Sequence, residues 1–127
     1  MNTTVTDRLL TGIESADFTA DLWTADAVFD ATVPNWRFAV HGGEQINTTL
    51  TGWFAEQGRF EEVRRTPLPG GELVEFVLSW TEQGVPHACH QAHILRIEND
   101  RIAAHTAFCG GRWSASLLAE MEEAAHA

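Results

Sequence analysis

The sequence contains no lysine and no tyrosine, and these two absences exclude several kinds of chemistry. Without lysine, the protein cannot form a Schiff base or hold a nucleotide phosphate through a P-loop lysine. Without tyrosine, no phenol group is available as an acid or as a donor to an oxyanion. All eight basic residues are arginine, so acid–base chemistry is left to histidine, aspartate, glutamate and cysteine.

Cysteine and positive charge are also scarce. The two cysteines are too few for a disulfide framework, and we expect free thiols. Eighteen acidic residues and eight arginines give a net charge of −10, which argues against nucleic acid or an anionic membrane as a partner. No apolar run approaches the roughly 18 residues of a membrane span, and no signal peptide is recognisable, so a cytoplasmic location is expected.

The chain of 127 residues has the length of one domain, and no linker or repeat divides it, so we expect a single domain over residues 1–127. Apolar residues at helical spacing predict helices that start near Thr6, cover residues 18–23 and cover residues 42–54. Alternating and β-branched residues between turn signals predict strands. These strands are expected over residues 27–34, 59–67, 73–81, 86–97 and 102–109.

Two further segments complete the expected fold. Arg37 and His41 are expected on a loop that precedes the helix over residues 42–54. The last helix is expected to be capped by Ser114 and to turn Leu117, Leu118 and Met121 toward the core. Helices followed by a run of strands are typical of the α+β class.

Three motifs, together with the order of the elements, resemble a known superfamily. They are LWTADAVFDATVP at residues 22–34, HGGEQI at residues 41–46 and HILRIENDRIAAHTAFCGG at residues 93–111. They resemble the nuclear-transport-factor-2-like superfamily in its SnoaL-like branch. The resemblance implies a cone-shaped, strongly bent antiparallel sheet wrapped around the N-terminal helices, with a central pocket and a C-terminal helix. It also implies a homodimer formed through the sheet.

The same resemblance suggests which residues do chemistry. Ketosteroid isomerase has an aspartate as base near the end of the strand that resembles residues 27–34, where this chain has Ala31, with Asp30 one position earlier. The neutral carboxylic acid of that enzyme corresponds to His93, and SnoaL-like cyclases carry titratable groups on the last two strands, where His93 and His105 lie. The resemblance therefore favours His93 as the leading acid–base residue and His105 as the second. Asp30 is a further candidate that could act as a base or orient a histidine, and its alternative roles are capping or simple solvation.

A cluster of histidine and cysteine lies in one predicted strand, which reads HACHQAH at residues 87–93. Side chains alternate between the two faces of a strand. Alternation assigns one face to His87, Cys89, Gln91 and His93, and the other to His90 and Ala92.

The strand register decides whether His93 and His105 meet. A tight hairpin at Asn99–Asp100 would put His93 opposite Thr106, and the two histidines would point to opposite sides of the sheet. A bulge of one residue would bring them to the same face. The residues alone allow both registers, and the family resemblance favours the bulged one.

Metal binding is the alternative role of the cluster. A metal requires three or four ligands within about 2.0–2.3 Å of one point, whereas positions i, i+2 and i+4 of a strand spread over about 13 Å. No HExxH or CxxC motif is present. We therefore expect neither a metal nor a cofactor. His93 and His105 are interpreted either as acid–base residues or as buried structural residues.

Five tryptophans suggest a pocket for a flat, apolar molecule. The residues predicted to contact it are Phe29, Trp36, Trp53, Phe54, Trp80, Gln91, Phe108 and Cys109. The leading hypothesis is an isomerase, cyclase or dehydratase type of enzyme that acts on an apolar or aromatic, polyketide- or steroid-like substrate. The alternative hypothesis is a ligand-binding or accessory module of the same fold that has no catalytic activity.

Overall fold

The computed structural model describes residues 3–126, so the ends of the predicted domain 1–127 lie outside the described part. Its helices are α1 (Val5–Ser15), the 3₁₀ turn η1 (Ala20–Leu22), α2 (Gly43–Trp53) and α3 (Ala115–Ala125). Its strands are β1 (Trp23–Val33), β2 (Trp36–His41), β3 (Gly58–Leu68), β4 (Gly71–Glu82), β5 (Val85–Glu98), β6 (Arg101–Cys109) and β7 (Trp113–Ser114). None of the helices within residues 3–126 has both the length and the apolar character needed to cross a membrane.

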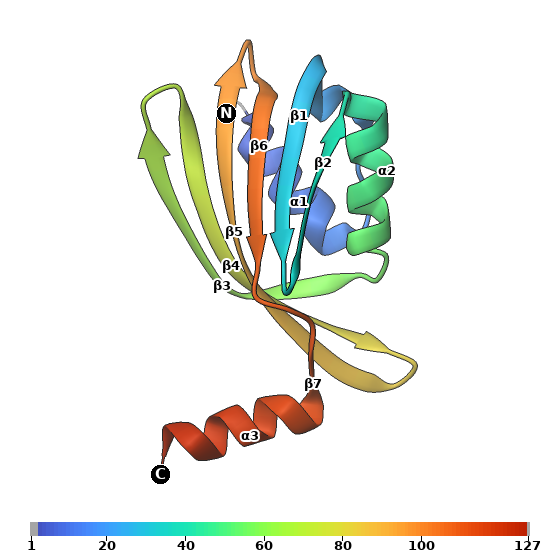
Figure 1. The fold of residues 1–127 in the computed structure, drawn as a ribbon, viewed down its shortest axis with the longest axis vertical. Coiled ribbons are helices and arrows are strands. Elements are labelled where there is room, and N and C mark those ends of the chain that lie inside the picture. The colour runs from blue at the N-terminus through green and yellow to red at the C-terminus, as the bar shows by residue number, and fades with distance from the viewer. Residues whose placement is uncertain (1–2, 127) are drawn as a thin grey trace.

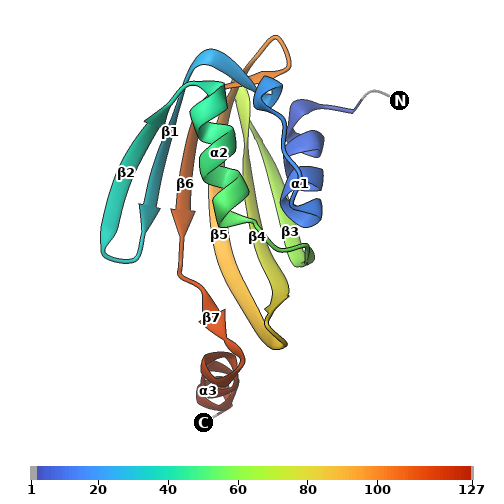
Figure 2. The ribbon, with the colours of Figure 1, turned by 90° about the vertical axis from the view of Figure 1, so that its right-hand side faces the viewer.

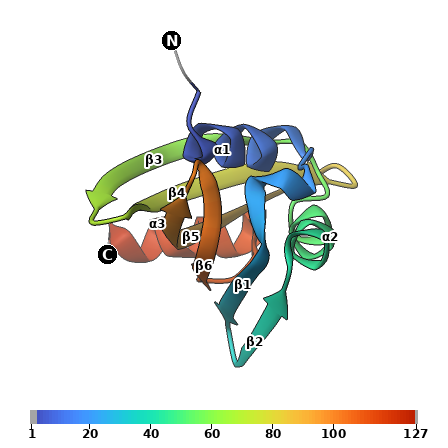
Figure 3. The same cartoon turned by 90° about the horizontal axis from the view of Figure 1, so that it is seen from above.

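The strands form one curved sheet in the order β2-β1-β6-β5-β4-β3, with β7 paired to β5 (Figure 1). Seen from above, the strands follow one another along an arc from β3 to β2 (Figure 3). All neighbours are antiparallel except β1 and β6, which run parallel, so the sheet is mixed and the wholly antiparallel prediction is wrong at this pair. No hairpin joins these two strands, and alternation along a strand carries no information about the direction of a distant neighbour.

The core lies between the concave face of the sheet and the helices α1 and α2 (Figure 2). Each helix turns its apolar stripe inward, which is how an amphipathic helix buries its apolar surface. The inward residues of the two helices are Val5, Leu9, Ile13, Ile46 and Leu50. The α+β fold, with a strongly bent sheet around the N-terminal helices, is therefore confirmed.

Two local predictions in the first third of the chain are wrong. Within the helix predicted over residues 18–23, only Ala20–Leu22 form a short turn, η1, and Trp23 already belongs to β1. The segment with Arg37 and His41 is strand β2 rather than a loop. It pairs with β1 in a hairpin in which Asn35 adopts a left-handed conformation with φ of 66°, and asparagine tolerates this conformation better than most residues do.

Helix α3 lies beyond the end of the sheet instead of covering the core (Figures 1 and 2). Ser114 caps it as predicted, but Leu117 and Met121 are 37% and 38% exposed, and α3 has no buried residue. The prediction that Leu117, Leu118 and Met121 face the core is therefore wrong. The segment turns outward after Gly111, which has a φ of 115°, and β7 pairs with the part of β5 that extends beyond the end of β6.

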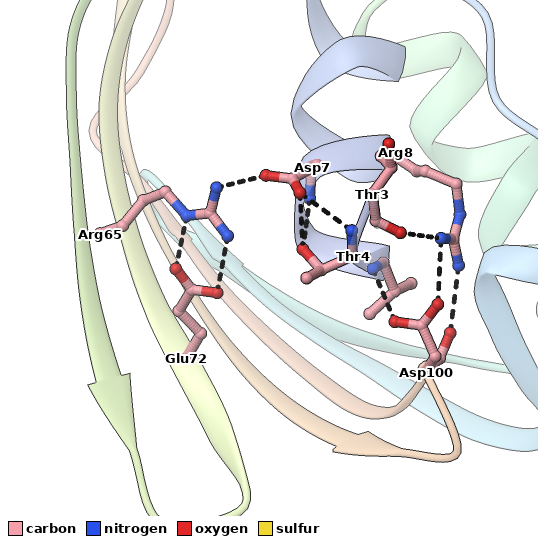
Figure 4. A network of polar contacts seen from close by, with 8 residues as sticks. Thr3, Thr4, Asp7, Arg8, Arg65, Glu72 and Asp100 are labelled. Carbon is pink, nitrogen blue, oxygen red and sulfur yellow. Dashed lines mark hydrogen bonds and ion pairs between the residues drawn. The ribbon is translucent and has the colours of Figure 1, made fainter. Parts of the chain in front are cut away.

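Ion pairs at both sides of its N-terminus hold α1 against the sheet (Figure 4). Asp7, in the capping box of α1, pairs with Arg65 of β3, and Arg65 also pairs with Glu72 of β4. Arg8 pairs with Asp100 in the β5–β6 turn at 3.0 Å. Hydrogen bonds from Arg65 and from the start of the helix lower the pKa of Asp7 to about 2.

A bulge in β6 sets the register between β5 and β6. Ile97 pairs with Ile102, whereas Arg96 pairs with Ala104, so Ala103 is the extra residue. His93 consequently lies opposite Ala107 instead of Thr106, and His93 and His105 share the inner face of the sheet. The bulged register is therefore confirmed.

Candidate functional site

A cavity of about 540 Å³ opens at the end of the sheet where β1 and β6 finish and where α2 ends. Its volume lies within the range of about 300–1,000 Å³ that is typical of sites for small molecules. It is lined by Val33, Pro34, Gly52, Trp53, Phe54, Ala55, Glu56, Leu78, Trp80, Glu82, Cys89, Gln91, Cys109, Gly111 and Arg112.

Five of the predicted contact residues line this cavity. They are Trp53, Phe54, Trp80, Gln91 and Cys109. They come from the end of α2, from β4, and from facing positions of β5 and β6, where Gln91 pairs with Cys109. The wall therefore combines aromatic surface with an amide and a thiol.

The other three predicted contact residues lie elsewhere. Phe29 is fully buried behind the wall, and the centre of its ring lies 5.5 Å from that of Trp53 and 4.7 Å from that of His105. Trp36 is 69% exposed on β2, and Phe108 is 47% exposed. Phe108 points outward because its neighbours in β6 point inward. Phe29, Trp36 and Phe108 therefore do not line this cavity.

Asp30 also lies outside the cavity. Its neighbours Phe29 and Ala31 are fully buried, so Asp30 points to the outer face of β1. There Arg37 donates to both of its oxygens, at 3.0 and 2.7 Å, and these hydrogen bonds lower the pKa of the carboxyl group. The Asp30–Arg37 pair therefore links β1 to β2, and among residues 3–126 the side chain of Asp30 makes no hydrogen bond to a histidine.

His93 and His105 meet directly beneath the cavity wall, where both are buried. Nδ1 of His93 lies 2.7 Å from Nε2 of His105, and Nε2 of His93 lies 2.8 Å from Oε1 of Gln91. On the other side, Nε1 of Trp23 donates to Nδ1 of His105 at 3.2 Å. Four side chains on three strands thus form one chain of hydrogen bonds, which we call the Trp23–Gln91 chain.

The direction of every bond in the Trp23–Gln91 chain follows from its first member. An indole N–H can only donate, so Nδ1 of His105 must accept and its proton must be on Nε2. Nε2 of His105 then donates to Nδ1 of His93, and Nε2 of His93 donates to the Gln91 oxygen. Both imidazoles are therefore neutral, and all four ring nitrogens are bonded to protein groups.

Burial favours the same neutral state. Desolvation lowers the pKa of His93 to about 3. Desolvation, together with the charge that His93 would carry, also lowers the pKa of His105. An imidazole of low pKa that has no free nitrogen is a poor general base, because it must first give up a bond within the protein.

The Trp23–Gln91 chain ends at the cavity. Nε2 of Gln91 donates to Sγ of Cys109 at 3.3 Å and to Sγ of Cys89 at 3.6 Å. The backbone N–H of Gly111 also donates to Cys109, at 3.4 Å. Burial raises the pKa of Cys89 to about 12, so this thiol stays protonated. Sulfur is a weak acceptor, so the two N–H groups of Gln91 are only weakly bonded.

An ion pair lies at the cavity wall. Arg112 pairs with Glu82, and its guanidinium lies 5.3 Å from the centre of the Trp80 ring. Glu82 also accepts from Nε1 of Trp80 at 2.9 Å. Sequence reasoning missed both charged residues, because Arg112 follows the last long strand and no spacing relates it to Glu82. Leu78 was also missed, although it shares one face of β4 with Trp80 and alternation could have found it.

Within residues 3–126, no three histidine, cysteine, aspartate or glutamate side chains converge on a point that could hold a metal ion. His87 and His90 belong to the HACHQAH motif but not to the Trp23–Gln91 chain. His87 packs against Trp80, and His90 is exposed on the other face of β5. The motif is thus divided between the two faces, as alternation predicts.

No model of a known protein family matches the sequence, and no curated protein matches it. Solved structures do. An NTF2-like protein from Anabaena variabilis is 16% identical, with a TM-score of 0.73 over 84% of each chain. A Bacillus subtilis protein named as a candidate isomerase is 15% identical, with a TM-score of 0.66 over 84% of this chain and 86% of its own. An LEH-like epoxide hydrolase of Mycobacterium tuberculosis is 12% identical, with a TM-score of 0.64 over 83% of this chain and 79% of its own.

These similarities show that the chain has the NTF2-like fold, as its motifs indicated. The structures that share this fold include proteins with names of the isomerase and epoxide hydrolase types. Identities of 12% to 16% carry no activity from them to this chain, because one fold supports many reactions.

Proposed function

We propose that the protein binds one small, apolar or aromatic molecule in the cavity beside Gln91. The observation that supports this proposal is a cavity of about 540 Å³ that combines aromatic walls with a single buried amide. Sites for small molecules are typically apolar, with a few polar groups that fix the orientation of the ligand. Trp53, Phe54 and Trp80 provide flat surfaces for such a ligand.

Binding is the proposed role because both histidines are occupied. His93 and His105 donate to and accept from protein groups only, and neither lines the cavity. In this arrangement they support the wall and do not reach a ligand. Among the two hypotheses from the sequence, this geometry favours the module without catalytic activity.

Catalysis of the isomerase, cyclase or dehydratase type is the second candidate function. It is favoured by the enzyme names among the similar structures, and by Cys109, Glu56 and Glu82 at the cavity. Acid–base catalysis by His93 and His105 would require the Trp23–Gln91 chain to open when substrate binds. If His93→Ala and His105→Ala both keep full turnover of an identified substrate, the histidine mechanism fails.

We also propose that two copies associate through the outer face of the sheet. Ile94 and Phe108 are exposed there on the neighbouring strands β5 and β6, and Phe108 lies opposite the small residue Ala92. Exposed apolar side chains that gather on one face are typical of an interaction surface. This face is separate from the cavity, which lies on the concave side.

Titration with N-phenyl-1-naphthylamine, a neutral aromatic fluorophore, tests the proposed binding. Leu78 lines the cavity, and Leu78→Trp fills part of it, whereas Thr81→Trp adds the same side chain at an exposed position of β4. We expect one binding site in the wild-type protein and in Thr81→Trp, and at least a tenfold loss of affinity in Leu78→Trp. Equal affinity in the two variants, or no binding to the wild-type protein, would overturn the proposal.

A further inference from the structure

We infer that Gln91 is a hydrogen-bond donor of fixed direction that selects ligands with a carbonyl oxygen, and that Trp23, His105 and His93 are positioning residues that fix its direction. This inference rests on the proposed function, because it names the chemistry of the molecule that the cavity binds. It concerns the buried end of the cavity, where the Trp23–Gln91 chain meets the two thiols.

Trp23 is the fixed starting point of the Trp23–Gln91 chain. This residue is 2% exposed, and its Nε1 bonds to His105, which is itself buried. If the order of protons were reversed, Nδ1 of His105 would carry a proton and two N–H groups would face one another. A buried donor without an acceptor is costly, so only one order of protons satisfies the whole chain.

The side-chain amide of Gln91 is also fixed in direction. An isolated glutamine can exchange its oxygen and nitrogen by a rotation of 180°, which alters little else. Here the oxygen accepts the proton on Nε2 of His93 at 2.8 Å. Rotation would place the NH₂ group against that N–H, and both donors would lose an acceptor. The NH₂ group of Gln91 is therefore held toward Cys109 and Cys89, both of which line the cavity.

The two thiols that the NH₂ group of Gln91 contacts are weak acceptors. The NH₂ group of Gln91 bonds only to thiol sulfurs, at 3.3 and 3.6 Å. An oxygen atom accepts more strongly than a thiol does. A ligand with a carbonyl group can therefore replace a weak bond with a stronger one. A ligand that can only donate, such as an ammonium ion, would place donor against donor and be rejected.

Carbonyl ligands also suit the rest of the cavity. The carbonyl would lie at Gln91, and the apolar part of the molecule would pack against Trp53, Phe54 and Trp80. The ligand class is therefore an apolar or aromatic ketone, aldehyde, quinone or lactone. No charge is required on the ligand, because every member of the Trp23–Gln91 chain is neutral.

Three probes with the same two-ring skeleton test the inference by calorimetry: 1-tetralone, tetralin and 1-aminotetralin. The comparison is made between the wild-type protein and Gln91→Leu, so that differences in the hydration of the probes cancel. We expect Gln91→Leu to lose about tenfold in affinity for 1-tetralone, which is the effect of roughly one hydrogen bond, and to keep its affinity for tetralin. The ratio of the affinity for 1-aminotetralin to the affinity for tetralin is expected to be lower in the wild-type protein than in Gln91→Leu, where the donor is absent.

An infrared measurement on the wild-type protein makes the test independent of any folding defect in Gln91→Leu. The carbonyl stretch of bound 1-tetralone is expected at lower frequency than that of 1-tetralone in an apolar solvent. An unshifted band would overturn the inference even if the affinity of the variant falls.

Trp23→Phe tests the positioning role, with Trp36→Phe as the matched control at an exposed position. Nitrogen NMR of the wild-type imidazoles is expected to show the proton on Nε2 of both His93 and His105. In Trp23→Phe we expect mixed tautomers and a smaller preference for 1-tetralone over tetralin. Unchanged tautomers and an unchanged preference would show that Trp23 fills space only, which contradicts the inference.

The outcomes separate the inference from the proposed function. If neither 1-tetralone nor tetralin binds, the proposed function fails, and the inference fails with it. If both bind and Gln91→Leu changes neither affinity, the cavity binds apolar molecules without recognising a carbonyl. In that case the inference alone is overturned.

Discussion

His93 and His105 are in direct contact, with Nδ1 of one 2.7 Å from Nε2 of the other, although they come from different strands. The extra residue Ala103 in β6 makes this contact possible, because without it the two side chains would lie on opposite faces of the sheet. The contact therefore depends on one backbone irregularity.

Deletion of Ala103 is expected to destabilise the protein severely. A shift of one residue would turn His105 and Ala107 to the outer face and bring exposed neighbours such as Phe108 into the core. Denaturation by urea would show a loss of several kcal/mol or an unfolded protein, because buried polar groups would lose their partners. A deletion variant as stable as the wild-type protein would mean that the histidine contact tolerates another register.

Acid is expected to destabilise the protein through the buried histidines before most carboxylates titrate. The pKa of His93 is about 3 in the folded protein, against about 6.5 in an unfolded chain. Below pH 6.5 the unfolded chain therefore binds more protons, and the free energy of unfolding falls as the pH falls. Each buried histidine contributes a slope that approaches about 1.4 kcal/mol per pH unit.

Urea titrations between pH 6.5 and pH 5 measure this slope. His93→Gln removes one of the two groups and is expected to flatten the slope, even though it also lowers the stability at neutral pH. His90→Gln, which changes an exposed histidine on the other face of β5, serves as the matched control. The same slope in His93→Gln and in the wild-type protein would mean that His93 titrates normally in the folded state.

Asp7 is expected to contribute modestly to stability. Its carboxylate caps α1 and pairs with Arg65, and its pKa is lowered to about 2. Because solvent screens part of this interaction, we expect Asp7→Asn to cost about 0.5–1 kcal/mol at pH 7. The difference should vanish as the pH falls from about 4 to about 2, where the wild-type carboxylate is itself protonated. Asp17→Asn, at an exposed position outside the ion pairs, is the control.

Removal of α3 is expected to change the stability little. A chain that ends at Ser114 keeps β7 and its pairing with β5. It loses a helix that has no buried residue. The thermal midpoint should fall by only a few degrees, consistent with a loss of about 1 kcal/mol or less. A larger loss that depends on protein concentration would show that α3 packs against a second copy of the chain.

Phe108→Glu tests the proposed association of two copies. A glutamate on the outer face of β6 would put charge into the interface and favour the monomer. Sedimentation equilibrium should show a dimer for the wild-type protein and a monomer for the variant. Glu75→Gln, a change on the outer face of β4 that removes a charge, should remain dimeric. A monomeric wild-type protein would overturn the proposed association.

Sequence periodicity predicted the parts of the fold that depend on local patterns. Apolar spacing and turn residues predicted helices α1 and α2 and strands β3 to β6. In each element one phase of the pattern turns the apolar side chains inward, and any other phase would bury polar side chains. The direction of β1 relative to β6 could not be predicted, because it depends on a pairing between distant segments. Helix α3 was placed incorrectly because an amphipathic pattern shows that a helix has an apolar face and does not show what covers that face.

The candidate site was predicted in composition better than in arrangement. Alternation put Gln91 and His93 on one face, and the structure has them there. The position of Trp23 in the Trp23–Gln91 chain could not be predicted, because Trp23 lies 82 residues from His105 in the sequence. The parallel pairing of β1 with β6 brings the two residues together. Trp36 and Phe108 were predicted to contact the ligand because they are aromatic. Alternation along the strand places Phe108 on the face opposite to His105, which would have excluded Phe108 from the cavity.

The one-way order of donors and acceptors also has an electrostatic consequence. In a row of bonds that all point the same way, the group dipoles add, and each bond polarises the next. The positive end of this row is the NH₂ group of Gln91 at the cavity, and the negative end lies toward Trp23. The cavity wall thus gains an attraction for electron-rich atoms without any net charge. This attraction should persist across the pH range in which an ordinary histidine would gain and lose its proton.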